Sequence, residues 1–421
     1  MRYARIGVAF GLFILIGINL GGGGVLLPVQ IDDYGVDKTT IGAIFWASSL
    51  GYGLAAAANG ALIHRFGIRA YLLCGAGVAL AAAAAIAVRA PFPLFIALQA
   101  ALGFGIGALE ACLNSYLSTL ERPTALLNSL HAFFGVGAVL GPLLAATMLT
   151  RGYAWTTFYV LLAALVAPLL AGLLLYPRMT APDPAAAPPR FSRALVHRGV
   201  WLGGLFLALY VGVEISVGSW TATFLTEDRE QGMAAAGWAV SGYWLGLTAG
   251  RFVLNRLFER IGVGVVGMIA ACLAGTVVSA AAIWLVPGGA VVGLALLGFC
   301  LGPMYPTMIA VMPRLVPAAL VATAIGLVVS LSVGGGALFP FLAGAIAQSF
   351  GTWSVFPLAI VLTALVSVVW WMIARRLAAG AGSERAPATP AAAAGIMPGA
   401  GSDPAVPSPQ DPERAEAGHA E

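Results

Sequence analysis

The stretch "LGFGIG", residues 102–107, returns 195 positions later as "LGFCLG", residues 297–302. A second pair, "GAVLGPLLA" (137–145) and "GGALFPFLA" (335–343), is similar at an offset of 198. A nearly constant offset across separate motifs indicates an internal duplication, so we predict two halves of similar structure. The offset of 195 also relates four single residues to their counterparts: Gly42, Gly51, Arg65 and Gly67 recur as Gly237, Gly246, Arg260 and Gly262.

The composition of the chain is that of a membrane protein. Of its 421 residues, 60% are hydrophobic and only 9% are charged, and the mean hydropathy is +0.94. Soluble domains carry about 25% charged residues. This composition argues against a soluble enzyme, a nucleic-acid-binding protein and a disulfide scaffold. The four cysteines lie in apolar runs, and their spacing matches no metal-binding motif.

Apolar runs of roughly 20 residues, the length of a bilayer-spanning helix, recur along the chain. The first run is too long for a cleaved signal peptide, so we expect it to remain as a helix. We therefore predict an all-α membrane protein with twelve transmembrane helices in two six-helix, pseudo-symmetric halves. The spans are placed near residues 6–29, 40–62, 70–88, 92–118, 126–149, 154–176, 199–225, 234–258, 262–286, 289–311, 319–346 and 353–375.

The runs also give a domain organisation. We predict an N-terminal six-helix bundle over 1–176, a cytoplasmic linker over 177–198 and a C-terminal six-helix bundle over 199–377. The remaining residues, 378–421, are rich in alanine and proline and weakly charged. Such segments bury too little apolar surface to fold, which predicts a disordered cytoplasmic tail.

Arginine and lysine are unevenly distributed between the two sides of the predicted spans. One side collects fifteen of them and the other four, and two lie in the tail, which accounts for all 21. Cytoplasmic loops carry the excess of positive charge. We therefore expect a multi-pass protein of the plasma (inner) membrane with both termini in the cytoplasm.

The segment "GALIHRFGIR" (60–69) is similar to the signature between helices 2 and 3 of the major facilitator superfamily, Gly-x-x-x-Asp-Arg-x-Gly-Arg-Arg. Gly60, Arg65, Gly67 and Arg69 match that signature, whereas His64 replaces its acid. The resemblance implies two parallel six-helix repeats with a substrate site between them near the middle of the membrane. It also implies that Arg65 and Arg69 belong to a cytoplasmic gating clamp.

A finer resemblance is to the fucose/glucose–galactose symporter family and its glucose-transporting relatives. "GIGALEACLN" (105–114) looks like that family's helix-4 pattern, and "YVGVE" (210–214) resembles its helix-7 pattern with Glu in place of an amide. "LNSLHAFFGVGAVLGP" (127–142) and "SGYWLGLTAGR" (241–251) are similar to segments of its relatives. Helix 1 departs from the pattern, because "NLGGGGVLLP" (19–28) offers glycines and Asn19 where fucose-type members carry an Asn and an Asp.

Two acidic residues stand out as candidates for proton coupling. Of 17 acidic residues, only Glu110 and Glu214 fall well inside predicted spans, and we expect no Lys or Arg at comparable depth. A charge near the bilayer centre costs roughly 2.5–3.5 kcal/mol on insertion scales, so it usually serves a function. The alternative for each is a neutral carboxyl group bonded to a neighbouring helix.

The other polar candidates are assigned by residue type and position. Hydroxyl, amide and aromatic groups can bind a hydroxylated solute, although amides in membranes also bond helices together, and aromatic residues such as Trp220 and Trp238 near span ends form the interfacial belt. We predict substrate binding by Asn19, Gln99, Asn114, Tyr210, Tyr243, Trp244 and Tyr305. We predict gating by Arg65, Arg69, His131 and Arg251, although a packed imidazole is the alternative for His131.

These features predict a secondary active transporter rather than an enzyme. The expected substrate is a small uncharged polar solute such as a sugar, moved by alternating access and coupled to protons (or sodium). The expected absence of a deep Arg or Lys argues against an anionic substrate. The alternative is a proton-coupled efflux antiporter for drug-like or cationic compounds. We expect a monomer in the lipid bilayer, with no cofactor, no metal and no nucleic-acid partner.

Overall fold

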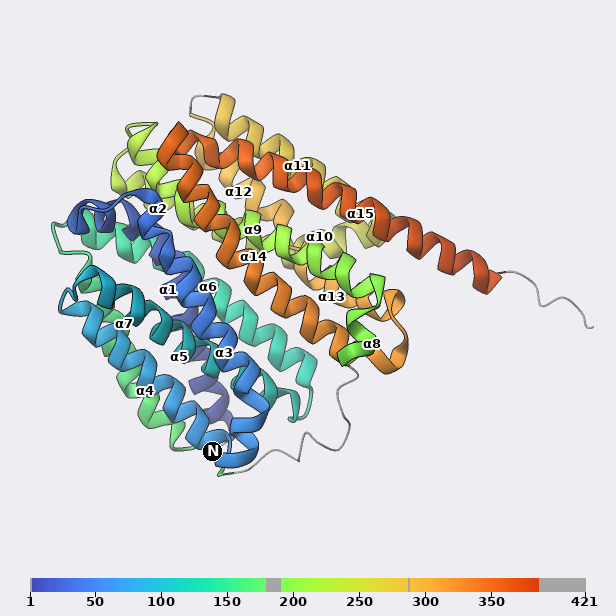
Figure 1. Cartoon of the computed structure of the whole chain (residues 1–421), viewed down its shortest axis with the longest axis horizontal. Helices are drawn as coiled ribbons and strands as arrows, with labels where there is room; N and C mark the ends of the chain where they lie inside the picture. Colours follow the sequence, from blue (N-terminus) through green and yellow to red (C-terminus); the bar gives the residue numbers. More distant parts are fainter. Residues whose placement is uncertain (1, 179–190, 287, 386–421) are drawn as a thin grey trace, which may run out of the picture. The chain divides into compact units, whose positions relative to one another are not determined.

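The computed structural model describes residues 2–178, 191–286 and 288–385. Within these ranges the protein is built of helices and contains no β-strand (Figure 1). The predicted all-α membrane fold is therefore confirmed. Most of the linker predicted over 177–198 and the tail beyond residue 385 lie outside the described residues.

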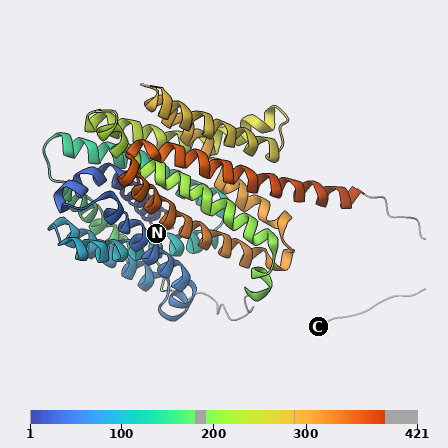
Figure 2. The same cartoon turned by 45° about the horizontal axis from the view of Figure 1, so that its top comes forward.

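Within the described ranges, the first half of the chain forms seven α-helices and the second half forms eight, which Figures 1 and 2 show as two groups. The first group comprises α1 (Arg2–Tyr34), α2 (Lys38–Ile41), α3 (Ala43–Phe66), α4 (Ile68–Ala87), α5 (Phe92–Ser118), α6 (Pro123–Thr150) and α7 (Thr156–Leu173). The second comprises α8 (Phe191–Leu195), α9 (Arg198–Glu227), α10 (Met233–Arg260), α11 (Val265–Leu285), α12 (Ala290–Leu301), α13 (Met304–Leu315), α14 (Val321–Phe350) and α15 (Val355–Arg385).

Each predicted span overlaps one long helix or a pair of consecutive helices, α2 with α3 and α12 with α13. Eleven helical segments of the described chain are long and apolar enough to cross a membrane. The remaining predicted span, 234–258, corresponds to α10. Glycine, tyrosine, tryptophan and several charged residues near its end make this helix less apolar than the others. Helix α15 continues to Arg385, so the chain is helical over 378–385, where the sequence predicted disorder.

Glycines that touch a neighbouring backbone reveal the duplication in three dimensions. A methyl group on Gly51 of α3 would collide with the carbonyl oxygen of Ala100 in α5. A methyl group on Gly246 of α10 would collide in the same way with that of Ala295 in α12. Both members of the first pair are 195 positions from those of the second. Small residues let membrane helices approach this closely, so the two halves pack their helices by one pattern.

Two further glycine contacts repeat with the same offset. Gly103 lies against the carbonyl of Ser48, and Gly298, its counterpart, lies against that of Tyr243. Gly107 and Gly302 repeat the relationship one turn further along, on the backbones of Tyr52 and Leu247. These glycines are helix-packing positions.

The two halves contact each other where α1 ends and α9 ends. The Lys38 ammonium group of α2 forms an ion pair with Glu227, at 2.9 Å. Its backbone N–H donates to the side-chain oxygen of Gln348 in α14, at 3.0 Å. Phe45 of α3 lies 6.3 Å, between ring centroids, from Trp220 of α9. These contacts join the halves at the end opposite the start of α1.

Residues 1–379 form one compact unit that contains both groups of helices. The boundaries of the two six-helix bundles, 1–176 and 199–377, therefore stay a prediction. Within this unit the halves contact each other chiefly through α6 with α10, α1 with α9 and α3 with α14, and also through α2 with α14 and α1 with α10. Side chains from these and adjacent helices meet in the interior and form the candidate site.

Candidate functional site

Polar side chains from six helices gather between the two halves. We call this group the central polar cluster. Its members from the first half are Tyr52 on α3, Glu110 on α5 and His131 on α6, and those from the second half are Tyr210 and Glu214 on α9, Tyr243 and Arg251 on α10, and Tyr305 on α13.

The second half of the cluster is organised around an ion pair. Nη2 of Arg251 lies 3.7 Å from Oε1 of Glu214, whose residue is only 8% exposed. Arg251 precedes the end of α10 at Arg260 by nine residues, or about 13 Å of helix. The expectation that no Lys or Arg lies as deep as the two acids is therefore wrong. The structure places Arg251, predicted as a gating residue, against a proton-coupling candidate.

Two tyrosines surround this ion pair. The hydroxyl of Tyr243 donates to the backbone carbonyl of Glu214, at 2.9 Å, and so ties α10 to α9. The hydroxyl of Tyr210 lies close to the carboxylate of Glu214 and the guanidinium of Arg251, but it is buried and completes no hydrogen bond. The Nε of Arg251 is also buried without a hydrogen-bond partner in the described chain. The cluster thus holds donor groups that the described residues do not satisfy.

Glu110 occupies the first half of the cluster. Its carboxylate lies close to the hydroxyl of Tyr52 on the adjacent helix α3. Among the described residues it forms no ion pair. Tyr305, the counterpart of Glu110 at the offset of 195, lies within electrostatic range of both Glu110 and Glu214. The two carboxylates, one from each half, therefore share one tyrosine within their electrostatic range.

His131 brings a third group of the first half to the cluster. Its side chain is exposed, its ring meets that of Phe13 edge to face with centroids 5.5 Å apart, and it lies within electrostatic range of Arg251. The contact with Phe13 agrees with the packed imidazole that the sequence gave as the alternative. Whether it gates transport stays a prediction.

The predicted substrate-binding amides lie in different surroundings. Gln99 is buried and its amide donates to the hydroxyl of Tyr159 on α7, at 3.1 Å. Asn114 donates to the backbone carbonyl of Glu110, at 2.9 Å, and Asn19 on α1 is partly exposed. The structure thus joins Asn114 to the cluster through its own helix, and it uses the amide of Gln99 to bond helices together.

The aromatic candidates also divide. Trp244 is buried, packs edge to face on Tyr243 with centroids 5.2 Å apart, and leaves its indole N–H without a partner in the described chain. The rings of Tyr305 and Tyr210 lie 6.2 Å apart. Trp220 is fully buried and donates to the carbonyl of Pro340, at 2.8 Å, so its assignment to the interfacial belt is wrong. Trp238 is 66% exposed, as a belt residue would be.

The two arginines of the signature segment lie away from the cluster. The Nε of Arg69 donates to the carbonyl of Tyr176 after α7, at 2.6 Å. Arg65 is exposed and its guanidinium lies 5.2 Å from the ring centroid of Phe66. Their gating role stays a prediction.

The sequence did not single out Tyr52. The available signal was indirect: Gly107, one turn before Glu110, had to face a neighbouring helix, and that helix presents Tyr52 at the contact. Ser332 on α14, which contacts the hydroxyl of Tyr305, was also missed. In the described residues no group of three His, Cys, Asp or Glu side chains could hold a metal ion.

In the described residues, eleven helical segments apolar enough to cross a membrane and the long helix α10 form two repeats with a polar cluster between them, an arrangement typical of a multi-pass membrane transporter. Residues 9–234 and 205–401 match the family model described as Major Facilitator Superfamily. These matches cover more than half of the chain, and the chain belongs to the Major Facilitator Superfamily.

Several curated proteins are similar to parts or most of the chain. "Bypass of stop codon protein 6" of Saccharomyces cerevisiae is 25% identical over 407 residues, which cover 85% of this chain and 80% of that protein. A glucose/galactose transporter of Brucella abortus is 27% identical over 40% of this chain and 45% of its own length. The 3-(3-hydroxy-phenyl)propionate transporter of Escherichia coli is 27% identical over 61% of this chain and 65% of its own.

Solved structures share the fold at low sequence identity. The nucleoside transporter NupG superposes with a TM-score of 0.69 and 14% identity, over 89% of this chain and 98% of that one. A variant of the Escherichia coli fucose:proton symporter FucP gives a TM-score of 0.61 and 17% identity, over 88% and 98%. Together with the glucose/galactose relative, these likenesses confirm the predicted resemblance to this group of transporters.

Proposed function

We propose that the protein is a secondary transporter that moves a small uncharged polar solute, such as a sugar, by alternating access coupled to protons through Glu110. One observation carries the proposal: Glu110 and Glu214, from opposite halves, both lie within electrostatic range of Tyr305, and of the two only Glu214 has an ion-pair partner in the described chain. A rocking motion of the halves would alter the surroundings of both carboxylates at once. The central polar cluster is therefore the place where solute and proton binding can influence each other.

Glu110 is the proposed proton carrier because of how the two acids are neutralised. The guanidinium of Arg251 neutralises Glu214. A carboxylate inside a membrane-spanning helix is costly without a cation, and a proton is the alternative partner. Glu110 has a hydroxyl neighbour, Tyr52, but no cation in the described chain. Sodium coupling at the same carboxylate is the competing reading.

The unsatisfied donors of the cluster support a polar solute. The hydroxyl of Tyr210 and the indole N–H of Trp244 are buried and have no hydrogen-bond partner in the described residues. Buried polar groups are nearly always paired, so such groups mark places where a ligand or water binds. A sugar supplies hydroxyl acceptors and an apolar ring face for aromatic side chains. The name of the glucose/galactose relative agrees with this class.

A hydroxylated aromatic acid is the second candidate. The observation in its favour is Arg251, whose buried Nε lacks a partner in the described chain and whose contact with Glu214 is loose at 3.7 Å. A guanidinium recognises carboxylates well, and one relative is named for a hydroxyphenyl-propionate. The earlier argument against anions rested on the absence of a deep arginine, which the structure overturns. The hypothesis of efflux of cationic compounds becomes weaker, because Arg251 is already the cationic partner of Glu214.

The finer points of location and assembly belong to this proposal. We infer a monomer in the plasma (inner) membrane with both termini in the cytoplasm, and a transport role without catalysis. Reporter fusions at residue 180 and at the C-terminus should both give a cytoplasmic signal. A periplasmic signal at either would contradict the twelve-span topology. Deletion of 386–421 should leave transport by the inserted protein intact.

The test of coupling uses Glu110→Gln, which keeps the shape of the side chain and removes its proton exchange. Purified protein is first screened by thermal shift against glucose, galactose, fucose and 3-(3-hydroxyphenyl)propionate. In proteoliposomes with the solute so identified, E110Q should lose accumulation driven by a pH difference and keep exchange between labelled and unlabelled pools. The matched control is Glu259→Gln, an exposed acid at the end of α10. Full pH-driven accumulation by E110Q would refute the proposal for Glu110.

A further inference from the structure

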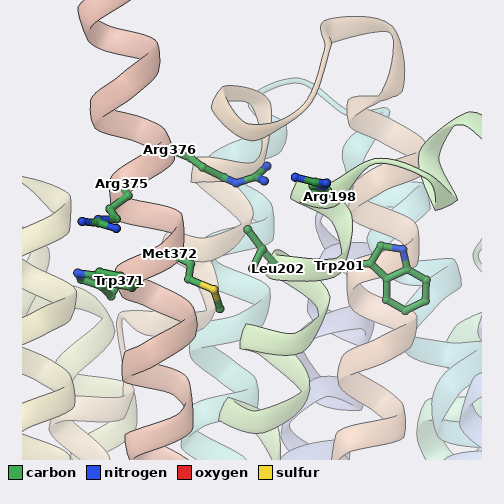
Figure 3. Close-up of a pocket in the computed structure, with 7 residues that line it drawn as sticks. All are labelled: Arg198, Trp201, Leu202, Trp371, Met372, Arg375 and Arg376. Atoms are coloured by element: carbon green, nitrogen blue, oxygen red, sulfur yellow. The ribbon is translucent and has the colours of Figure 1, made fainter.

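We propose that a groove between α9 and α15 binds the headgroup of an anionic phospholipid. This inference concerns a surface away from the central polar cluster and does not depend on the transported solute. The groove has a volume of about 470 Å³. It is lined by Arg198, Trp201 and Leu202 of α9 and by Trp371, Met372, Arg375 and Arg376 of α15 (Figure 3).

The lining is strongly basic. Three of the seven residues are arginines and none is Asp or Glu. Figure 3 shows the side chains of Arg198 and Arg376 reaching toward each other from the two helices. Like charges repel, and an anion between them offsets this repulsion. The guanidinium fork matches the geometry of a phosphate. An anion is therefore the complement of this groove.

The backbone of α9 adds to the positive field. Helix α9 is 30 residues long and begins at Arg198, so its N-terminus lies at the groove. The first N–H groups of a helix carry a partial positive charge equivalent to about half an elementary charge. The imidazole of His197 satisfies the N–H of Gly199, and the neighbouring arginines supply the full charges.

The depth of the arginines matches a headgroup. Arg375 lies 20 residues after Val355, the start of α15. At 1.5 Å per residue this is about 30 Å, the thickness of the hydrocarbon core. Trp371, one turn earlier, is 54% exposed and occupies the level at which tryptophan anchors at the interface. The groove thus opens at the boundary between acyl chains and headgroups.

An apolar stripe leads from the groove along α15. Val361, Leu365, Val368 and Trp371 are all about half exposed and follow one another at steps of four, three and three residues. This spacing places them on one face of the helix. A free phosphate would gain nothing from such a stripe, whereas a lipid would lay an acyl chain on it. The ligand is therefore expected to be amphiphilic.

The side chain of Arg375 is restricted by a contact with Trp371. The guanidinium of Arg375 lies 4.2 Å from the ring centroid of Trp371. Stacking on an aromatic face restricts the side chain without neutralising its charge. On α9, the indole N–H of Trp201 donates to the carbonyl of Leu195, at 2.6 Å, which fixes the corner between α8 and α9.

The test is native mass spectrometry of the full-length, detergent-solubilised protein titrated with phosphatidylglycerol, with phosphatidylcholine and with inorganic phosphate. We expect phosphatidylglycerol to bind well above phosphatidylcholine, and inorganic phosphate at equal concentration not to displace it. A basic residue near a membrane contributes about 1 kcal/mol to the attraction of anionic lipid. Each of R198Q, R375Q and R376Q should therefore weaken binding by about fivefold.

The matched controls are R256Q and R260Q, exposed arginines near the end of α10. Both should bind phosphatidylglycerol like the wild type. The single variants remove exposed charges only, and size-exclusion profiles verify that each is folded. R375K should retain most of the binding, because it keeps the charge. Unchanged binding in all three groove variants, equal losses in the controls, or displacement by inorganic phosphate would each overturn the lipid site.

Discussion

Arg251 and Glu214 form an ion pair in the interior of the second half, with 3.7 Å between the guanidinium and the carboxylate. Each group would be costly there alone, because a buried charge needs a partner. The pair joins α9 to α10, and Tyr243 reinforces the joint with a hydrogen bond to the backbone of Glu214. The interior of the described chain thus holds one neutralised pair beside one unpaired acid, Glu110.

We predict that removing either partner of this pair destabilises the protein more than removing both. Arg251→Met should leave Glu214 without its cation and lower stability by about 3–5 kcal/mol, as should Glu214→Met for the opposite reason. The double variant should lose much less, because no unpaired charge remains. Stability is measured by thermal and chemical unfolding in detergent, and the coupling is read from the double-mutant cycle.

Arg256→Met is the control for this cycle. Arg256 lies on the same helix and is exposed, so its loss should change stability little. Losses for the two single variants that add in the double variant would show that the pair does not couple, which would contradict the prediction.

The repeated glycine contacts give a second prediction. Gly51→Ala and Gly246→Ala each place a methyl group against a backbone carbonyl of the neighbouring helix. Each should lower the free energy of unfolding by about 1–3 kcal/mol, the typical effect of overpacking, and by similar amounts because the two sites are equivalent by the duplication. The measurement is the unfolding midpoint of purified protein in detergent.

Gly53→Ala is the matched control on the same helix as Gly51. An added methyl group there meets nothing within 4 Å. Alanine is about 1 kcal/mol better than glycine inside a helix, so this variant should be neutral or slightly stabilised. A Gly53→Ala variant as unstable as Gly51→Ala would show that the loss is not caused by helix contact.

The sequence was sufficient for the fold because the deciding features are local or periodic. Apolar runs predict the spans, and the glycines at an offset of 195 predict which helices touch in the same way in both halves. Such glycines are needed wherever two membrane backbones meet. The pattern therefore contains information about packing as well as about secondary structure.

The sequence was insufficient to predict the site, because residue type and spacing do not give the distances between side chains on different helices. Arg251 lies within the predicted span 234–258, yet the sequence led us to expect no arginine at the depth of the two acids. Only the approach of α9 shows that it has a partner in the interior. Tyr52 carries no charge and has no motif, so its contact with Glu110 could not be inferred from residue type.

We predict that Lys38 holds the two halves together at their contact beyond α1. Its ion pair with Glu227 is partly exposed, with side chains 18% and 40% accessible. Such pairs contribute up to about 1 kcal/mol, or about fivefold in an equilibrium. Lys38→Gln should therefore increase the population in which the halves separate at this end. Spin labels at Thr40 and Ser349, on α2 and α14, should report a larger fraction of long distances.

Arg89→Gln is the control for the Lys38 experiment. Arg89 pairs with Asp33, at 2.7 Å, but both belong to the first half. Its loss should leave the distance between the labels unchanged. A larger change in R89Q than in K38Q would contradict the assignment of Lys38 to the contact between halves.

Asp228 and Asp37 lie outside the membrane-spanning helices and should respond to pH in opposite directions. Burial raises the pKa of Asp228, which follows α9 and accepts a hydrogen bond from Thr352, above its usual value of 3.8. The backbone N–H of Thr40 donates to Asp37 at the start of α2, at 2.6 Å, and lowers the pKa of that carboxyl group below 3.8.

The sign of each effect follows from proton linkage. Folded Asp228 binds its proton more tightly than the unfolded chain does, so its contribution is fully present below 3.8 and is lost as pH rises through its raised pKa. Folded Asp37 binds its proton less tightly, so its contribution is present above 3.8 and is lost as pH falls through its lowered pKa. Asp228→Asn should therefore gain stability relative to the wild type at neutral pH, and this advantage should shrink on acidification.

Asp37→Ala removes the helix cap, should be less stable at neutral pH, and should approach the wild type at the acid end. Unfolding midpoints measured in detergent from about pH 3 to pH 7, across the ordinary aspartate range, separate the two cases. Two variants whose differences from the wild type change in the same direction with pH would contradict this assignment of the two carboxyl groups.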